Sequence, residues 1–138
     1  MHAPETVALP VRDVARAVGF YRDRAGFELE HESVDAGGWL AILTPPGPGS
    51  AIVVGDLPEL AAEAPGSQRG LGYVVDDVAE ARREMLARGV ACSSVTAARG
   101  RAACFGFRDP DGNTWAVREP ASAARRSRAL GRFLGRRA

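Results

Sequence analysis

The residue types that most often perform chemistry in proteins are scarce in this chain. It has two histidines, His2 and His31, and two cysteines, Cys92 and Cys104. Neither pair has the CxxC or HxxxH spacing of a metal site, and no arrangement of Ser, His and Asp suggests a catalytic triad. Two cysteines are also too few for a disulfide scaffold, so we expect free, buried thiols. No single motif therefore predicts a catalytic or metal centre.

Two short stretches resemble ligand-binding loops, but both are incomplete. Gly70-Leu71-Gly72 lacks the third glycine of a dinucleotide-binding loop, because valine stands at position 75. Asp109-Pro110-Asp111-Gly112 lacks the later ligands and the closing glutamate of a calcium loop. The second stretch is instead typical of a hairpin turn, since proline fixes one torsion and Asp-Gly tolerates positive φ.

Two side chains of the first half are candidates for ligand contacts. His31 is the histidine within a predicted strand, and alternation puts it on the face of Leu29, away from the neighbouring glutamates. It is either an ordinary packed or rim histidine or a polar contact in a pocket. Trp39 is either a core residue or a stacking surface for a ligand. Both alternatives stay open for each residue.

Three further candidates follow from the predicted hairpin around Asp109–Gly112. Phe105 and Phe107 share one face of the strand before it, and we expect pairing across the turn to set them with Thr114, Ala116 and Arg118. The two phenylalanines would then form aromatic walls of a pocket. Arg118 would be an anion or carbonyl contact inside a concave face, or a solvated arginine at its rim.

The segments that must position these residues form an internal sequence repeat. Val11–Ala17 reads VRDVARA and Val75–Ala81 reads VDDVAEA, with five of seven positions identical. Each copy follows a short apolar run and precedes a helix-period segment that a glycine ends, Gly26 or Gly89. Asp13 and Asp77 are natural N-caps of these helices. Such a repeat indicates two equivalent structural modules.

Each module is predicted to be βαβββ. The expected strands are Thr6–Val11, Phe27–Val34, Trp39–Leu43 and Ala51–Val54, then Gly70–Val75, Val90–Val95, Ala102–Arg108 and Thr114–Glu119. One helix covers only one face of a four-stranded sheet. We therefore predict an α+β domain in which the two modules form a curved, cupped mixed sheet, with helices on the outer face and a concave inner face that holds a ligand.

The predicted boundaries are a domain over residues 1–120 and a basic tail over residues 121–138. The domain divides into module one (5–55), a linker (56–69) with one helical turn at Leu57–Glu63, and module two (70–119). The domain carries 12 arginines against 17 acidic residues, whereas the tail has six arginines and no acid. We expect the tail to be a basic amphipathic helix that pairs with the acidic domain, and we do not expect nucleic-acid binding.

Composition favours an ordinary globular protein of the cytoplasm. The chain is 46% hydrophobic and 25% charged, close to the average of such proteins. No apolar run approaches the roughly 20 residues of a membrane helix, and the first residues lack the pattern of a signal peptide. No membrane partner is expected.

Three stretches resemble the vicinal oxygen chelate superfamily: LPVRDVARAVGFYRDRAGFEL, VDDVAEARREMLARGV and FRDPDGNTWAV. That group contains glyoxalase I, extradiol dioxygenases, fosfomycin-resistance enzymes and bleomycin-resistance proteins. The resemblance covers about residues 5–119 and implies paired βαβββ modules. It also implies that the metal ligands of metal-dependent members fall here on Thr6, Gly70 and Ala116. None of these is a credible ligand, so we expect neither a metal nor another cofactor.

The missing ligands favour the binding branch of this family. We expect a metal-free small-molecule-binding protein that sequesters an antibiotic or other natural product, as bleomycin-resistance proteins do. The alternative is a metal-independent isomerase, cyclase or lyase that uses His31, Arg118 or a nearby acid. A metal-dependent glyoxalase or dioxygenase is the least favoured reading. The resemblance also suggests a homodimer, with the cup built either by one chain or by exchanged modules.

The expected ligand is flat or aromatic, because small residues leave room where the metal would sit and aromatic residues would form the walls. The predicted ligand-binding residues are His31, Trp39, Phe105, Phe107, Arg118, Thr6, Gly70 and Ala116.

Overall fold

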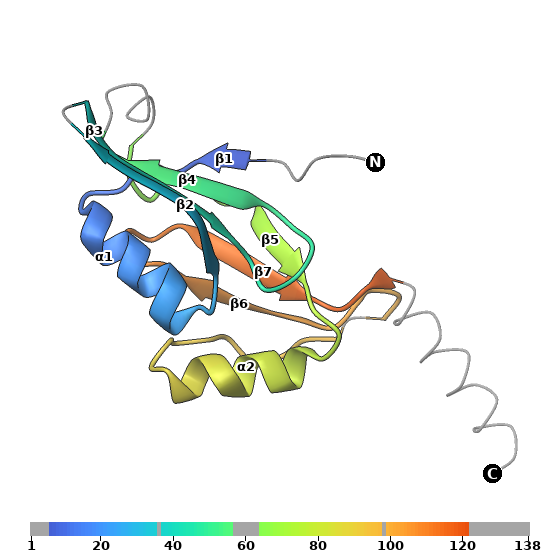
Figure 1. Ribbon diagram of the computed structural model, residues 1–138. Helices are drawn as coiled ribbons and strands as arrows, with labels where there is room; N and C mark the ends of the chain where they lie inside the picture. The colour runs from blue at the N-terminus through green and yellow to red at the C-terminus, as the bar shows by residue number, and fades with distance from the viewer. Residues whose placement is uncertain (1–5, 36, 57–63, 98, 122–138) are drawn as a thin grey trace, which may run out of the picture.

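The described residues form two mixed β-sheets and two α-helices, which confirms the predicted α+β class (Figure 1). The computed structural model describes residues 6–35, 37–56, 64–97 and 99–121. The first half contains β1 (Thr6–Ala8), α1 (Val14–Gly19), the π-helical turn η1 (Phe20–Arg24), β2 (Glu28–Asp35), β3 (Gly38–Thr44) and β4 (Ala51–Gly55). The second half contains β5 (Leu71–Val74), α2 (Val78–Ala87), β6 (Cys104–Arg108) and β7 (Thr114–Arg118).

The sequence repeat is also a repeat of topology. The first sheet has the order β1-β4-β3-β2 and the second has the order β5-β7-β6. In each sheet the first strand of the module lies parallel to its last strand, and the remaining neighbours are antiparallel. The two modules therefore have the same strand arrangement, and in each module the helix follows the first strand.

The second module departs from the prediction at its second strand. Residues 90–95 do not form a continuous strand; two isolated bridges, Cys92 to Phe107 and Thr96 to Cys104, connect this segment to β6. Between the two bridges the register shifts by one residue. In addition, the Ser93 side chain accepts the backbone N–H of Gly106 at 2.8 Å. The Ser93 hydroxyl thus accepts the backbone N–H of Gly106, which in a regular pair of strands would bond to a backbone carbonyl.

The predicted helix of the first module begins as expected but changes form near its end. Asp13 accepts the backbone N–H of Arg16 at 3.0 Å, as an N-cap should. After Gly19 the helix continues as η1, and the backbone N–H of Ala25 bonds to the carbonyl of Phe20, five residues back. Gly26 then ends the turn at φ 80°, as predicted.

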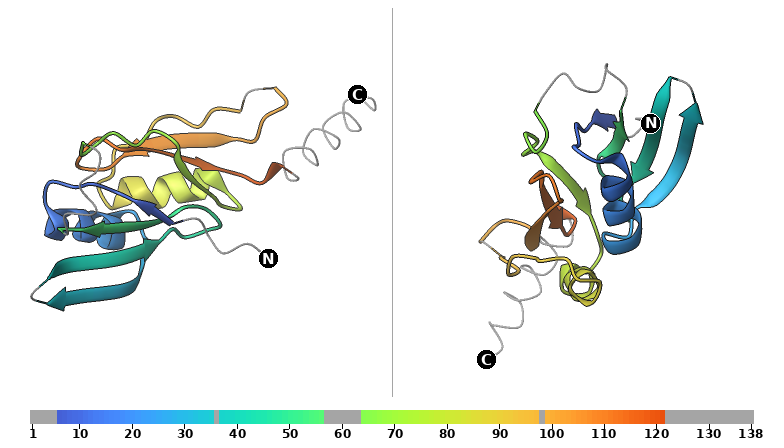
Figure 2. Two further views of the ribbon diagram at one scale, coloured as in Figure 1. Left: turned by 90° about the horizontal axis from the view of Figure 1, so that it is seen from above. Right: turned by 90° about the vertical axis from the view of Figure 1, so that its left-hand side faces the viewer.

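The wider turn directs the side chains of η1 into the second module. The rings of Tyr21 and Trp115 lie 5.8 Å apart, and those of Phe20 and Phe107 lie 6.3 Å apart. In Figure 2 α1 lies between the two sheets. The helix-facing side chains of both sheets therefore share one core, in which Tyr21 and Tyr73 are among the largest fully buried residues.

A cluster of buried polar groups joins the β6–β7 turn to η1. The Tyr21 hydroxyl donates to Asp109 Oδ2 at 2.6 Å and accepts from Trp115 Nε1 at 2.9 Å. The other oxygen of Asp109 accepts the backbone N–H groups of Asp111 and Asn113. Burial, followed by the negative charge of Asp109, raises the pKa of Tyr21, so its hydroxyl remains protonated and donates.

An ion pair holds the same turn against the start of the first helix. The backbone N–H and Nη1 of Arg12 both donate to Asp111 Oδ1, at 3.2 and 3.0 Å, and Arg16 Nη2 lies 3.4 Å from the same oxygen. The Asp111 side chain is 1% exposed. Removal of both guanidinium groups would leave a buried carboxylate without a counter-charge, which is costly. The turn sequence thus connects the two modules as well as the two strands.

The hairpin register differs from the prediction, and the difference exchanges the two faces of β7. Asn113 belongs to the turn, since its carbonyl accepts the backbone N–H of Asp109 at 3.0 Å. The turn therefore has one residue more than Asp109–Gly112. Phe105 consequently lies opposite Val117 rather than beside Ala116. A shift of one residue moves every side chain to the other face, so the predicted pairing of the phenylalanines with Thr114, Ala116 and Arg118 is wrong.

Some predicted segments lie outside the described residues. They are the helical turn at Leu57–Glu63 and the basic helix beyond residue 121. Within the ranges that are described, none of the helices has the length and apolar character needed to cross a bilayer.

Replacement of Tyr21 by phenylalanine should destabilise the fold. It leaves Asp109 Oδ2 and Trp115 Nε1 each with one hydrogen bond fewer in a buried site, a loss of about 1–3 kcal/mol in the free energy of unfolding. Tyr73→Phe is the matched control, because Tyr73 is equally buried but its hydroxyl meets only Met85 Sδ, at 3.9 Å. Urea unfolding followed by circular dichroism measures both changes. Equal losses for the two variants would contradict this role of Tyr21.

Candidate functional site

The second sheet has one face in the core and one face that the described helices leave uncovered. Phe105, Phe107, Trp115 and Val117 point into the core. Their neighbours in sequence form the opposite side, called here the open face: Gly72, Val74, Cys104, Gly106, Arg108, Thr114, Ala116 and Arg118. The candidate site is on this face.

A row of small residues crosses the open face. Gly72 pairs with Ala116, and Ala116 pairs with Gly106 on its other side. Ser93 continues the row, because its backbone N–H donates to the carbonyl of Gly106 at 2.9 Å. These four residues, the small-residue row, project no side chain larger than a hydroxymethyl group. A flat molecule could therefore approach the sheet backbone along this line.

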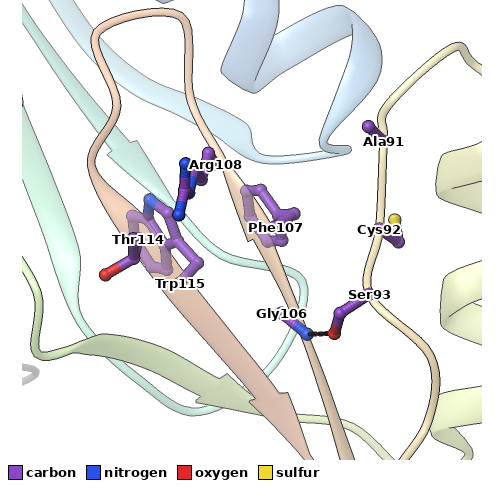
Figure 3. A pocket seen from close by; sticks show the side chains of 8 residues that line it. All are labelled: Ala91, Cys92, Ser93, Gly106, Phe107, Arg108, Thr114 and Trp115. Atoms are coloured by element: carbon purple, nitrogen blue, oxygen red, sulfur yellow. Dashed lines mark hydrogen bonds between the residues drawn. The ribbon is translucent and has the colours of Figure 1, made fainter.

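A cavity of about 400 Å³ lies over one end of the small-residue row (Figure 3). Residues 91–93, β6 and β7 line it. Phe107 and Trp115 are among the lining residues, although their rings, stacked 5.9 Å apart with an interplanar angle of 1°, are buried in the core. Because Gly106 has no side chain, a planar ligand can approach the backbone of the sheet at this point.

The predicted site residues are divided between the two sheets. Ala116 and Arg118 are on the open face of the second sheet, and Gly70 is exposed just before β5. Thr6 and His31 are exposed on the first sheet, where Thr6 pairs with Ala51 and His31 lies opposite Ile42. No hydrogen bond or strand pair joins Thr6 to either Gly70 or Ala116. Their meeting on one concave floor remains a prediction.

The predicted aromatic residues occupy different environments. Trp39 is half-buried and donates its indole N–H to Glu32 at 2.8 Å. By register it is on the face of the first sheet opposite to that of His31. Phe105 is 2% exposed in the core, whereas Phe107 is almost as buried but also lines the cavity. Phe107 is thus the predicted aromatic residue that contributes to this cavity.

Several residues of the site escaped the sequence-based prediction. They are Ser93, Gly106, Arg108, Thr114 and Trp115. Inclusion of Asn113 in the turn would have found most of them, because the corrected register puts Arg108 opposite Thr114 and Gly106 opposite Ala116. The signal was present in the sequence, since asparagine commonly occupies turns.

The residues that the resemblance places at the family's metal positions do not fit a metal ion. Thr6 offers one neutral hydroxyl, and Gly70 and Ala116 offer no side-chain donor. Across the described ranges, no group of three or more His, Cys, Asp or Glu side chains is arranged to hold a metal ion. A catalytic zinc site needs about three protein ligands, and no step of a reaction can be assigned to a metal on these residues.

The two cysteines are free and half-buried. Burial raises the pKa of the Cys92 thiol, which disfavours the nucleophilic thiolate form. Cys104 is on the open face, where its Sγ lies 3.4 Å from Thr96 Oγ1. The geometry gives neither thiol the partner that activates a catalytic cysteine.

Solved structures with the same fold come from several bacteria. A glyoxalase/bleomycin resistance protein from Streptomyces sp. CB03234 is 29% identical, with a TM-score of 0.72, and the match covers 85% of this chain and 100% of the other. TnmS3, an antibiotic binding protein from the same organism, is also 29% identical at a TM-score of 0.72, with 87% and 97% covered. A superfamily member from Sphaerobacter thermophilus DSM 20745, 24% identical at a TM-score of 0.71 over 87% and 98%, shows the fold alone.

A search of curated protein sequences finds no significant match. The family comparison is decisive, because the model of the Glyoxalase/Bleomycin resistance protein/Dioxygenase superfamily matches residues 4–117, most of the chain. The repeated strand–helix topology, the DPDGN turn and this match agree. The chain belongs to the glyoxalase/bleomycin resistance protein/dioxygenase superfamily.

Proposed function

We propose that this protein binds a flat small molecule without a metal ion and thereby sequesters an antibiotic or other natural product. The observation that carries the proposal is the pairing of Gly72, Ala116 and Gly106 across the open face. Ala116 is also a position where metal-dependent relatives would supply a ligand. These three residues therefore offer space but no metal-binding side chain, which suits binding better than metal-assisted catalysis.

The comparisons support the binding branch of the superfamily. One of the similar structures is described as an antibiotic binding protein, and the match covers 87% of this chain and 97% of the other. Fold similarity at this level of identity does not by itself assign a ligand. It does make sequestration the function to test first.

The ligand site is proposed to be completed by a second copy of the chain. The first sheet also has a face directed away from the core, with Leu40, Ile42 and Val53 half-exposed on it. Apolar side chains on a sheet face are stabilised when another surface covers them. A homodimer in which this face covers the open face of another chain would enclose the ligand. Light scattering on the purified protein should give twice the chain mass, and a monomer would contradict this arrangement.

The competing function is a metal-independent isomerase, cyclase or lyase in the same cup. It would need His31, Arg118 or an acid to move a proton at the ligand. His31 and Arg118 belong to different sheets, so one chain does not bring them together by strand pairing. Mass spectrometry of the ligand recovered after incubation separates the two functions, because sequestration leaves its structure unchanged.

A large side chain in the small-residue row should abolish binding of a planar aromatic compound. Ala116→Trp adds an indole on the open face while the backbone of β7 stays paired on both sides. We expect affinity to fall at least about 100-fold, since the floor would be occupied. Ala79→Trp on the exposed surface of α2 is the control for added bulk. Calorimetry with a panel of polycyclic natural products measures binding, and an unchanged affinity in Ala116→Trp would place the ligand elsewhere.

The purified protein should carry no stoichiometric transition metal. Added zinc, iron, nickel or manganese should leave the melting temperature unchanged, because only a ligand that binds the native state tightly raises it. Elemental analysis and thermal unfolding provide the measurements. One bound metal per chain, lost together with an activity, would refute the metal-free proposal.

A further inference from the structure

The charges on the open face are all positive. Arg108 and Arg118 are both exposed there, and their side chains form no ion pair or hydrogen bond with the described residues. The face-forming positions of β5, β6 and β7 include no aspartate or glutamate. Glu119, the acid that directly follows β7, is already engaged, since it accepts the backbone N–H of Val78 at 3.1 Å.

The two arginines stand on either side of the small-residue row. Arg108 pairs with Thr114, and Arg118 pairs with Cys104, so the two cross-strand positions are four residues apart along β7. At about 3.4 Å per residue this separation is about 14 Å. Ala116 and Gly106 lie midway between them. This distance is comparable to the length of a tricyclic aromatic system with one substituent at each end.

The position of Arg118 indicates that it reaches over this interval. Its Nη1 lies 3.6 Å from the point that a Cβ atom on Gly72 would occupy. The guanidinium therefore extends across the sheet toward Gly72, at one end of the row, while the residue remains exposed. Arg108, at the other end, is part of the cavity lining (Figure 3). A guanidinium recognises planar acids such as carboxylates by paired hydrogen bonds.

We propose that Arg108 and Arg118 determine ligand specificity, and that the ligand is a planar aromatic compound with an acidic group at one or both ends. The ring system lies over Ala116 and Gly106, between the two arginines, and each acid meets one arginine. This inference rests on the proposed binding function and narrows its ligand class. Acidic ligands that expose both charges would be preferred over neutral compounds of the same shape.

The test compares two probes of one shape. One is the anthraquinone disulfonate with a sulfonate on each outer ring, and the other is the neutral bis(hydroxymethyl) analogue with the same substitution pattern. We expect the disulfonate to bind at least about tenfold more tightly to the wild-type protein at low salt. Its affinity should also fall as salt is added, because both arginines are exposed.

Variants assign the preference to the two side chains. Arg108→Gln and Arg118→Gln should each weaken disulfonate binding about five- to tenfold, and should change binding of the neutral probe by less than about twofold. Arg24→Gln, a charge removal at an exposed residue of η1, is the control and should change neither. Circular dichroism confirms that each variant is folded.

The outcomes separate this inference from the function on which it rests. If both probes bind equally well, or if the two variants weaken both probes alike, the arginines do not select acids, although planar ligands are still bound. If neither probe nor any polycyclic natural product binds the wild-type protein, the proposed function fails and the inference fails with it.

Discussion

The hydrogen bond from Tyr21 to Asp109 is the contact on which the arrangement of the two modules depends. It joins the end of the first helix to the turn that carries β6 and β7. Trp115 donates to the same hydroxyl, so the tyrosine also orients the indole beneath the candidate site. In the core such a group must keep its partners, because a buried polar atom without one costs more than the bond contributes.

The open face follows from this constraint through strand alternation. With Trp115 held toward Tyr21, the neighbouring positions on β7 have to face the other way. Ala116 and Arg118 are therefore directed onto the uncovered side, together with Gly106 across the ladder. The ligand site is thus on the side of the second sheet opposite to the core. Its small residues and its two arginines face outward because the aromatic residues that alternate with them face the core.

The repeat made much of the fold predictable. Asp13 and Asp77 cap the two helices, and Gly26 and Gly89 end the helical segments with positive φ. These features are local, since each depends on a few neighbouring residues whose preferences the sequence displays directly. The parallel pairing of the first and last strands within each module was not predicted, because the order of elements does not fix which strands are neighbours.

The faces of the hairpin were not predicted, because they depend on one residue. The predicted turn ended at Gly112, but the side chain and backbone of Asn113 are both used inside the turn. The π-helical turn and the broken second strand of module two depend on distant partners, Asp109 for the former and Gly106 for the latter. Local pattern carries little information about such tertiary contacts.

The most direct test of the account is to map where a planar aromatic ligand binds. Amide chemical shifts of labelled protein, recorded as the ligand is added, report each backbone position separately. The account predicts that the largest changes fall on Gly72, Ser93, Gly106 and Ala116. Changes confined instead to the groove along α1, which Arg16, Gly19 and Pro110 line, would contradict a ligand site on the open face of the second sheet.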